Sequence, residues 1–162
     1  MGQIMLFGSH SICGIPTEVM TWIQQYTNQG HKFLIGDGKG VESALHRALS
    51  SVGATVTIYA MDDARNNTYE FPVKSFNTFY DEEAKTVTIS ASDNSIEPFT
   101  IENVEKAMDI PHNRQWYEFR DRQMIKDCDI AIGLWDGETK ATSHIIQLLN
   151  IYNKPCYVFT IK

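Results

Sequence analysis

Short apolar runs alternate along this chain with segments whose apolar residues recur at helical spacing. The runs Gln3–Gly8, His31–Gly36 and Ala54–Ala60 are rich in aliphatic and β-branched residues, which is typical of buried strands. Between them, the segment from Pro16 to Gly30 and the segment Val41–Ser51 each carry one apolar face at helical spacing. This half of the chain is therefore predicted to form strand, helix, strand, helix and strand.

The same alternation returns toward the end of the sequence. A helical pattern over Trp116–Lys126 precedes an apolar run at Cys128–Trp135, and a second helical pattern at Ala141–Tyr152 precedes the run Cys156–Ile161. Strands that alternate with helices favour a parallel sheet covered on both faces. We predict an α/β fold: a Rossmann-like, three-layer αβα arrangement with a mostly parallel sheet.

The middle of the chain has a different pattern. Tyr69–Ser92 alternates in short β-type runs, which predicts a small antiparallel unit. The following stretch, Ser95–Arg114, holds two prolines and a helical-looking patch at Ile101–Met108. We predict one domain over residues 1–162, with a small β-rich insertion at about 68–115.

Composition narrows the class of protein. A chain of 162 residues with 43% hydrophobic and 21% charged residues can bury a core without disulfides or a structural metal. The apolar runs are too short to span a bilayer and no secretion signal is visible, so we expect a cytoplasmic protein that does not bind membranes. The three cysteines lie far apart, and neither they nor the histidines show metal-ligand spacing, so no metal and no cofactor are expected.

Three loops that follow predicted strands carry candidate chemistry: residues 8–10, 36–40 and 136–142. In an open α/β sheet, ligands bind beyond the carboxyl ends of the strands. Glycines let the backbone approach a ligand closely, and the first N–H groups of a helix favour an anion such as phosphate. Tight turns and ordinary helix caps explain each loop taken alone, but two such loops in one chain favour a ligand site.

Arginines and acids lie where they can reach the same edge. Arg65 follows the third strand and Arg120 lies on the helix before the fourth, and an arginine fork suits a phosphate. Glu42, Asp121 and Glu138 are the acids placed to hold ribose hydroxyls or to act in catalysis. Surface ion pairs and solvent-facing acids are the simpler interpretation of each residue.

Several segments together resemble the SLOG superfamily of Rossmann-like proteins that bind nucleotide-type ligands, in particular its small stand-alone bacterial or phage members. The segments are the Gly8-Ser9 turn, FLIGDGKGVESALHRAL, VTIYAM with the DARNN that follows, RDRQM, and IAIGLWDGETKATSHIIQLLNIYNKPCYVF. The resemblance covers roughly residues 3–67 and 116–161. Its members include the lonely-guy enzymes, which release a base from its ribose monophosphate, nucleotide sensors and DNA-processing proteins. The lonely-guy signature PGGxGTxxE is absent from this sequence.

The resemblance implies a nucleotide-type pocket with three groups of residues. They are Gly8, Ser9, Gly36, Asp37, Gly38, Gly40 and Glu42 on one wall, Arg65, Asn66, Arg120 and Asp121 reaching in, and Trp135, Asp136, Gly137, Thr139 and Thr142 on the phosphate side.

These observations leave three functions open. The first is the binding of a nucleotide or nucleotide-sugar, with its anionic group held by helix N-termini. The second is hydrolysis or transfer of an N-glycosidic bond in a nucleoside or its monophosphate, with Glu42, Asp121 or Glu138 as the catalytic acid. The third is single-stranded DNA binding, which the formal net charge of −6 disfavours. Aromatic residues in and beside the insertion also suggest a homodimer or a higher homo-oligomer.

Overall fold

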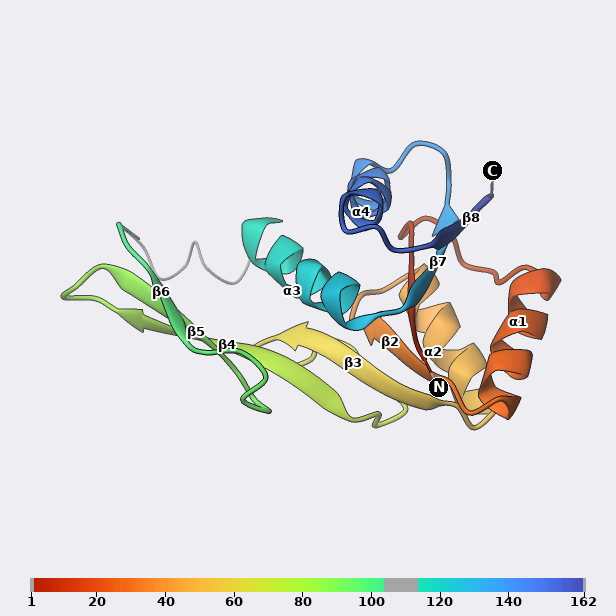
Figure 1. Ribbon diagram of the computed structural model, residues 1–162, viewed down its shortest axis with the longest axis horizontal. Coiled ribbons are helices and arrows are strands. Elements are labelled where there is room, and N and C mark those ends of the chain that lie inside the picture. The colour runs from red at the N-terminus through yellow and green to blue at the C-terminus, as the bar shows by residue number, and fades with distance from the viewer. Residues whose placement is uncertain (1, 104–113, 162) are drawn as a thin grey trace.

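The computed structural model describes residues 2–103 and 114–161 (Figure 1). In chain order its elements are β1 (Gln3–Gly8), α1 (Thr17–Asn28), β2 (Lys32–Gly36), α2 (Val41–Ser51), β3 (Thr55–Met61), β4 (Val73–Asp81), β5 (Thr86–Ala91), β6 (Phe99–Ile101), α3 (Arg114–Asp127), β7 (Ile130–Trp135), α4 (Lys140–Ile151) and β8 (Cys156–Thr160). None of the helices within these residues is long and apolar enough to cross a membrane.

One sheet of eight strands runs through the described residues in the order β6-β5-β4-β3-β2-β1-β7-β8. Neighbouring strands are parallel throughout the part β4-β3-β2-β1-β7-β8. Among the described strands, the pairs β4/β5 and β5/β6 are antiparallel. Leu6 of β1 pairs with Ile35 on one side and with Ile132 on the other. The apolar runs form these inner strands because both faces of the sheet are covered there. The predicted mixed α/β, mostly parallel, three-layer fold is confirmed.

Two apolar cores lie on opposite faces of the sheet. Val19 and Ile23 of α1 and Leu45 and Leu49 of α2 pack in one core, against inward-facing residues of the strands. The other core contains Met124 and Ile125 of α3 together with residues of α4. Figure 1 shows α3 and α4 together on one side of the sheet. The helical pattern in the sequence thus places one apolar stripe of each helix on the sheet.

The predicted β-rich insertion is part of the main sheet. Its first strand, β4, pairs in parallel with β3, with Ile58 opposite Val73, so that the sheet continues into β5 and β6. These strands form the left part of the sheet in Figure 1, and Phe119 of α3 contacts Phe76 of β4 and Phe99 of β6. The antiparallel pairing was predicted, but the parallel junction was not, because hydrophobic alternation does not say which strand pairs with which. The expected helical patch at 101–108 begins in β6 at Ile101, and its residues 104–108 lie outside the described part.

The order of the strands fixes where loops separate at the carboxyl edge. From β1 the chain continues to β2 and β3 on one side, whereas β7 lies on the other side of β1. The loops after β1 and β7 therefore lead to helices on opposite faces of the sheet. Such a reversal of strand order opens a crevice between the two loops.

Candidate functional site

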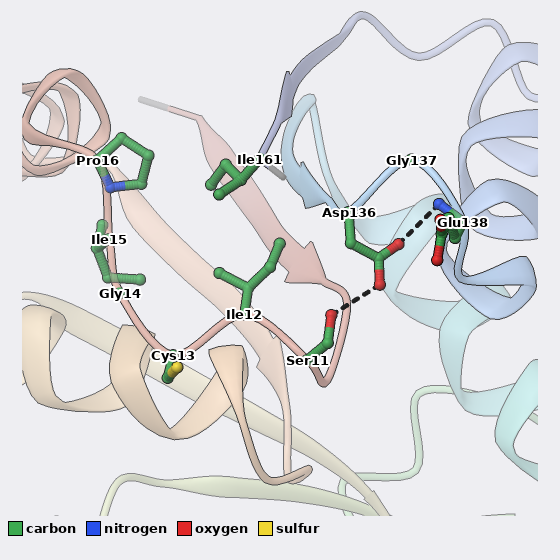
Figure 2. Close-up of a pocket in the computed structure, with 10 residues that line it drawn as sticks. All are labelled: Ser11, Ile12, Cys13, Gly14, Ile15, Pro16, Asp136, Gly137, Glu138 and Ile161. Atoms are coloured by element: carbon green, nitrogen blue, oxygen red, sulfur yellow. Dashed lines mark hydrogen bonds between the residues drawn. The ribbon is translucent and has the colours of Figure 1, made fainter.

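An open pocket lies at the reversal point between β1 and β7. Its volume is about 930 Å³, and residues 11–16 of the loop after β1 and Asp136–Glu138 of the loop after β7 form its walls, together with Ile161. Figure 2 shows these two loops facing each other, with Ile161 at one end of the space between them. Ile12, Ile15 and Ile161 make part of the lining apolar, and the carboxylates of Asp136 and Glu138 supply its charge.

A buried carboxylate, Asp37, organises the neighbouring part of the edge. Asp37 follows β2 and is only 1% exposed. Its Oδ1 accepts hydrogen bonds from Arg65 Nη2 at 2.8 Å and from Arg120 Nη1 at 2.8 Å, and its Oδ2 accepts one from the Arg65 backbone N–H at 2.8 Å. Burial by itself would raise the pKa of Asp37, but the hydrogen bonds from Arg65 and the charge of Arg120 lower it below the usual range.

Arg120 brings α3 to this carboxylate. Its Nε and Nη2 donate to Asp121 Oδ1 at 3.1 and 2.8 Å, while its Nη1 is held by Asp37. Burial favours loss of the proton from Arg120, but the surrounding Asp121, Glu42 and Asp37 raise its pKa, so that it stays charged. Arg120 is therefore a buried cation surrounded by carboxylates, and it links α3 to the loop after β2.

Two glycines, one at the end of β2 and one in the loop after it, allow other parts of the protein to approach the backbone closely. A Cβ on Gly36 would collide with Glu42 Oε2 and would lie 3.1 Å from Arg120 Cζ. Gly40 has a φ of 73°, and a Cβ there would collide with the backbone of His10. The glycine-rich loop is thus required for close approach, and the approach of a ligand to it stays a prediction. The groups that approach in the described structure are side chains and backbone of the protein itself.

Glu42 differs from its neighbouring acids. Burial raises the pKa of its carboxyl group, and so do the nearby charges of Asp121 and Asp37, while Arg120 and a backbone hydrogen bond from Gly38 lower it by less. The cluster of three acids and two arginines therefore favours a protonated Glu42 more than a protonated Asp37. A carboxylic acid held protonated can donate a proton or a hydrogen bond to a ligand.

Neighbouring residues hold the glycine-rich loop in place. Asn66 Nδ2 donates to the Gly38 carbonyl at 3.0 Å and to Ser43 Oγ at 2.8 Å. On the opposite side, His46 Nε2 lies 2.9 Å from the Gly36 carbonyl. Burial lowers the pKa of His46, so its neutral ring donates this hydrogen bond. Asn66 thus acts on loop geometry, although the resemblance implied contact with a ligand.

The loops after β1 and β7 are joined by buried hydroxyl groups. Ser9 and Thr142 are both buried, and their hydroxyl oxygens lie 3.1 Å apart. The backbone N–H of Asp136 donates to Ser9 Oγ at 3.2 Å, and Trp135 Nε1 donates to the Thr139 carbonyl at 3.1 Å. Ser9 therefore joins the loop after β1 to Asp136 and Thr142, whereas the bond of Trp135 lies within the loop after β7.

Asp136 lies in the loop between β7 and α4 and accepts hydrogen bonds from that loop. Its Oδ1 accepts hydrogen bonds from the backbone N–H groups of Glu138 and Thr139, at 2.9 and 2.7 Å. Its Oδ2 accepts from Thr139 Oγ1 at 2.5 Å and from Ser11 Oγ at 2.7 Å, and Figure 2 shows the Ser11 contact across the pocket. These hydrogen bonds, those from Thr139 foremost, hold the pKa of Asp136 well below its usual range. A carboxylate of the protein thus lies where a phosphate was expected.

The residues selected from the sequence fall into two groups at one edge. The first, the arginine–carboxylate cluster, contains Asp37, Glu42, Arg65, Arg120 and Asp121, with Gly36, Gly38 and Gly40 packed beside it. The second, the switch-point group, contains Ser9, Trp135, Asp136, Gly137, Glu138, Thr139 and Thr142, with Gly8 at the end of β1. Of the candidate catalytic acids, Glu42 and Asp121 lie around Arg120, whereas Glu138 lies on the wall of the pocket.

Three contributors were missed in the sequence. Tyr117 lies under both guanidinium groups, with its ring centre 4.5 Å from Arg65 Cζ and 5.6 Å from Arg120 Cζ. Its place three residues before Arg120 on one helix was the available signal. His46 follows Glu42 by four residues on α2, which places the two on one helix face. Ser11 carried no signal beyond its closeness to Ser9, because its partner Asp136 is remote in sequence.

Comparison with known proteins does not assign the chain to a family. No family model and no curated protein matches the chain. The resemblance to the SLOG superfamily stays a prediction that rests on the quoted residues. Within the described residues, no group of three or more histidines, cysteines or acids is arranged to hold a metal ion.

Replacing Arg120 tests whether the cluster is as tightly coupled as its contacts indicate. We expect Arg120→Met to lower the free energy of unfolding by about 3–5 kcal/mol at pH 7, because it leaves buried carboxylates without their cation. In the wild type the stabilisation from Asp37, whose pKa is lowered on folding, is present at neutral pH and is lost as the pH falls below the unfolded value of 3.8. In the variant, protonation of the stranded acids restores stability on acidification. The difference between the proteins should therefore shrink toward pH 4, as measured by urea unfolding.

The matched control is Arg122→Met, two residues away on the same helix. Arg122 is 40% exposed and pairs with Glu118 on the surface. This substitution should lower the free energy of unfolding by less than about 1 kcal/mol, and the loss should depend little on pH. Equal losses in the two variants would contradict the special role of Arg120.

Proposed function

We propose that the chain binds a nucleotide-type small molecule, meaning a base with its sugar and with or without phosphate, at the carboxyl edge of the sheet. The supporting observation is the pocket of about 930 Å³ at the reversal of strand order between β1 and β7. Open α/β sheets bind their ligands at this position. The volume lies within the range of small-molecule sites in proteins.

The lining of the pocket suits a flat ring. Ile12, Ile15, Pro16 and Ile161 offer apolar surface from two directions. The polar side chains of the lining include the hydroxyl group of Ser11 and the carboxylates of Asp136 and Glu138. A planar heterocycle with ring N–H and amino groups would bury its faces against the apolar side chains and direct its donors to the acids.

The arginine–carboxylate cluster supports recognition of a sugar. The Oδ1 atom of Asp121 accepts both hydrogen bonds from Arg120, and no hydrogen bond to its second oxygen is found among the described residues, so that oxygen can accept from a hydroxyl group. Glu42 adds a second carboxyl group beside the same arginine. Two neighbouring carboxyl groups can hold vicinal hydroxyls of a ribose.

Cleavage of an N-glycosidic bond is the second candidate, and the environment of Glu42 favours it. Two carboxyl groups in unlike environments can divide the roles of acid and nucleophile between them. Burial and nearby acids raise the pKa of Glu42, which suits a group that protonates a departing base. Asp121, paired with Arg120, would be the carboxylate that faces the anomeric carbon.

We also propose that the chain associates with a second copy of itself. The edge strand β8 pairs only with β7 among the described strands, so one side of its backbone is open. Tyr157 and Val158 on β8 and Ile151 at the end of α4 are exposed apolar side chains. An open, uncharged edge can pair with its own copy about a twofold axis.

Calorimetry with a panel of nucleosides, nucleoside phosphates and ADP-ribose tests the main proposal. We expect at least one compound to bind, and Cys13→Trp to weaken that binding by about tenfold or more. Cys13 lines the pocket and is exposed, so the larger ring fills the pocket without disturbing the core. Cys13→Ser is the matched control and should bind like the wild type. A folded wild-type protein that binds nothing in the panel would contradict the proposal.

Release of free base from nucleosides and their monophosphates tests the catalytic candidate. We expect the wild type to release base and Glu42→Gln to be slower by about 10²-fold or more, because the amide cannot donate the proton. The wild-type rate should fall as the pH rises through the pKa of Glu42. Glu82→Gln, in the exposed turn between β4 and β5, controls for loss of one acid. Absence of turnover in the wild type would contradict the catalytic candidate and leave ligand binding as the proposed function.

Analytical ultracentrifugation tests the proposed self-association. We expect Val158→Lys to shift the protein toward monomer, because a charge on β8 opposes edge pairing. Phe79→Lys is the control, since Phe79 is 68% exposed on β4, far from β8 in the sheet. A wild type that is monomeric at all concentrations would refute the assembly.

A further inference from the structure

The loop that leads into α4 already holds an anion, and that anion is the carboxylate of Asp136. The carboxylate of Asp136 takes the backbone N–H groups of Glu138 and Thr139 and the hydroxyl groups of Thr139 and Ser11, all at 2.5–2.9 Å. These N–H groups lie in the loop just before α4, which begins at Lys140, and with the two hydroxyl groups they are donors that a phosphate in this loop would use. A phosphate could reach them only by displacing this carboxylate from four hydrogen bonds.

The arginines are engaged in the same way. All three nitrogen positions of the Arg120 guanidinium donate to Asp37 or Asp121. Nε and Nη2 of Arg65 both donate to Asp37 Oδ1, at 3.2 and 2.8 Å. The bidentate edge that an arginine would offer to a phosphate is therefore turned to a carboxylate in both residues.

The net field at the crevice also opposes an anion. Among the described residues that line the pocket, Asp136 and Glu138 are acidic and none is a lysine or an arginine. In the neighbouring cluster, two arginines face Asp37, Asp121 and Glu42, so the positive charge does not exceed the negative charge. A doubly charged phosphate would enter a region of negative potential.

From these three observations we infer that the crevice selects a ligand without phosphate, a nucleoside or a free base, and excludes the corresponding nucleotide. This inference rests on the proposed binding of a nucleotide-type molecule and narrows its class. Asp136 is the specificity-determining residue, because its fixed carboxylate takes the hydrogen-bond donors of the loop before α4.

Competition between adenosine and adenosine 5′-monophosphate, and likewise between inosine and its monophosphate, tests the inference by calorimetry on the wild-type protein. We expect the nucleoside of at least one pair to bind at least about tenfold more tightly than its monophosphate. Asp136→Ala frees the N–H groups of Glu138 and Thr139, and we expect it to reverse or abolish this preference. Glu138→Ala is the matched control: it removes the same charge from the pocket and leaves the hydrogen bonds of Asp136 intact, so most of the preference should remain.

The outcomes separate the inference from the function on which it rests. Monophosphates that bind the wild type more tightly than nucleosides would overturn the inference and leave the proposed function standing. Absence of binding by every nucleoside and nucleotide would overturn both. Amide resonances of Glu138 and Thr139 in the wild type give a second measurement that needs no variant. They should not shift with millimolar inorganic phosphate, and a saturable shift would overturn the inference.

Discussion

Asp37 is almost fully buried, and a buried carboxylate needs cations and hydrogen-bond donors to compensate for lost water. It finds them on two segments far away in sequence, Arg65 after β3 and Arg120 on α3. The Arg120 contact spans 83 positions and joins α3 to the loop that follows β2. This contact sets where α3 lies relative to the carboxyl edge, and the rest of that edge depends on it. A pair of this kind is costly to break because the remaining partner is left buried and unpaired.

The carboxylates at this edge also affect which hydrogen-bond donors are open to a ligand. Glycines and helix N-termini at strand ends ordinarily offer unfilled anion sites. In this chain Asp37 and Asp121 instead take the arginine donors, and Asp136 takes the N–H groups of Glu138 and Thr139 in the loop before α4. What remains is a pocket lined by apolar side chains and by the acids Asp136 and Glu138, beside a cluster in which burial raises the pKa of Glu42. That combination suits a neutral heterocycle and hydroxyl groups better than a phosphate.

Much of this could be predicted from the sequence, because local patterns carry it. The inner strands and α2 are within a residue or two of their predicted bounds, since apolar runs and helical spacing report burial directly. The loops at the carboxyl edge were found for the same reason. The parallel pairing of β4 with β3 and the partners of Asp136 were not predicted. Both depend on which remote segments meet, and hydrophobic pattern is silent on that. The sequence therefore indicated Asp136 as a ligand contact, but it did not indicate its hydrogen bonds to Ser11 and Thr139.

The most direct test of this account is a crystal structure of the protein soaked with adenosine and, separately, with its 5′-monophosphate. The account predicts the adenine ring between residues 11–16 and Asp136–Glu138, the ribose directed toward Glu42 and Asp121, and the hydrogen bonds of Asp136 to Thr139 unchanged. It predicts no phosphate density at the start of α4. A phosphate bound to the backbone of Glu138 and Thr139, with Asp136 displaced, would contradict it.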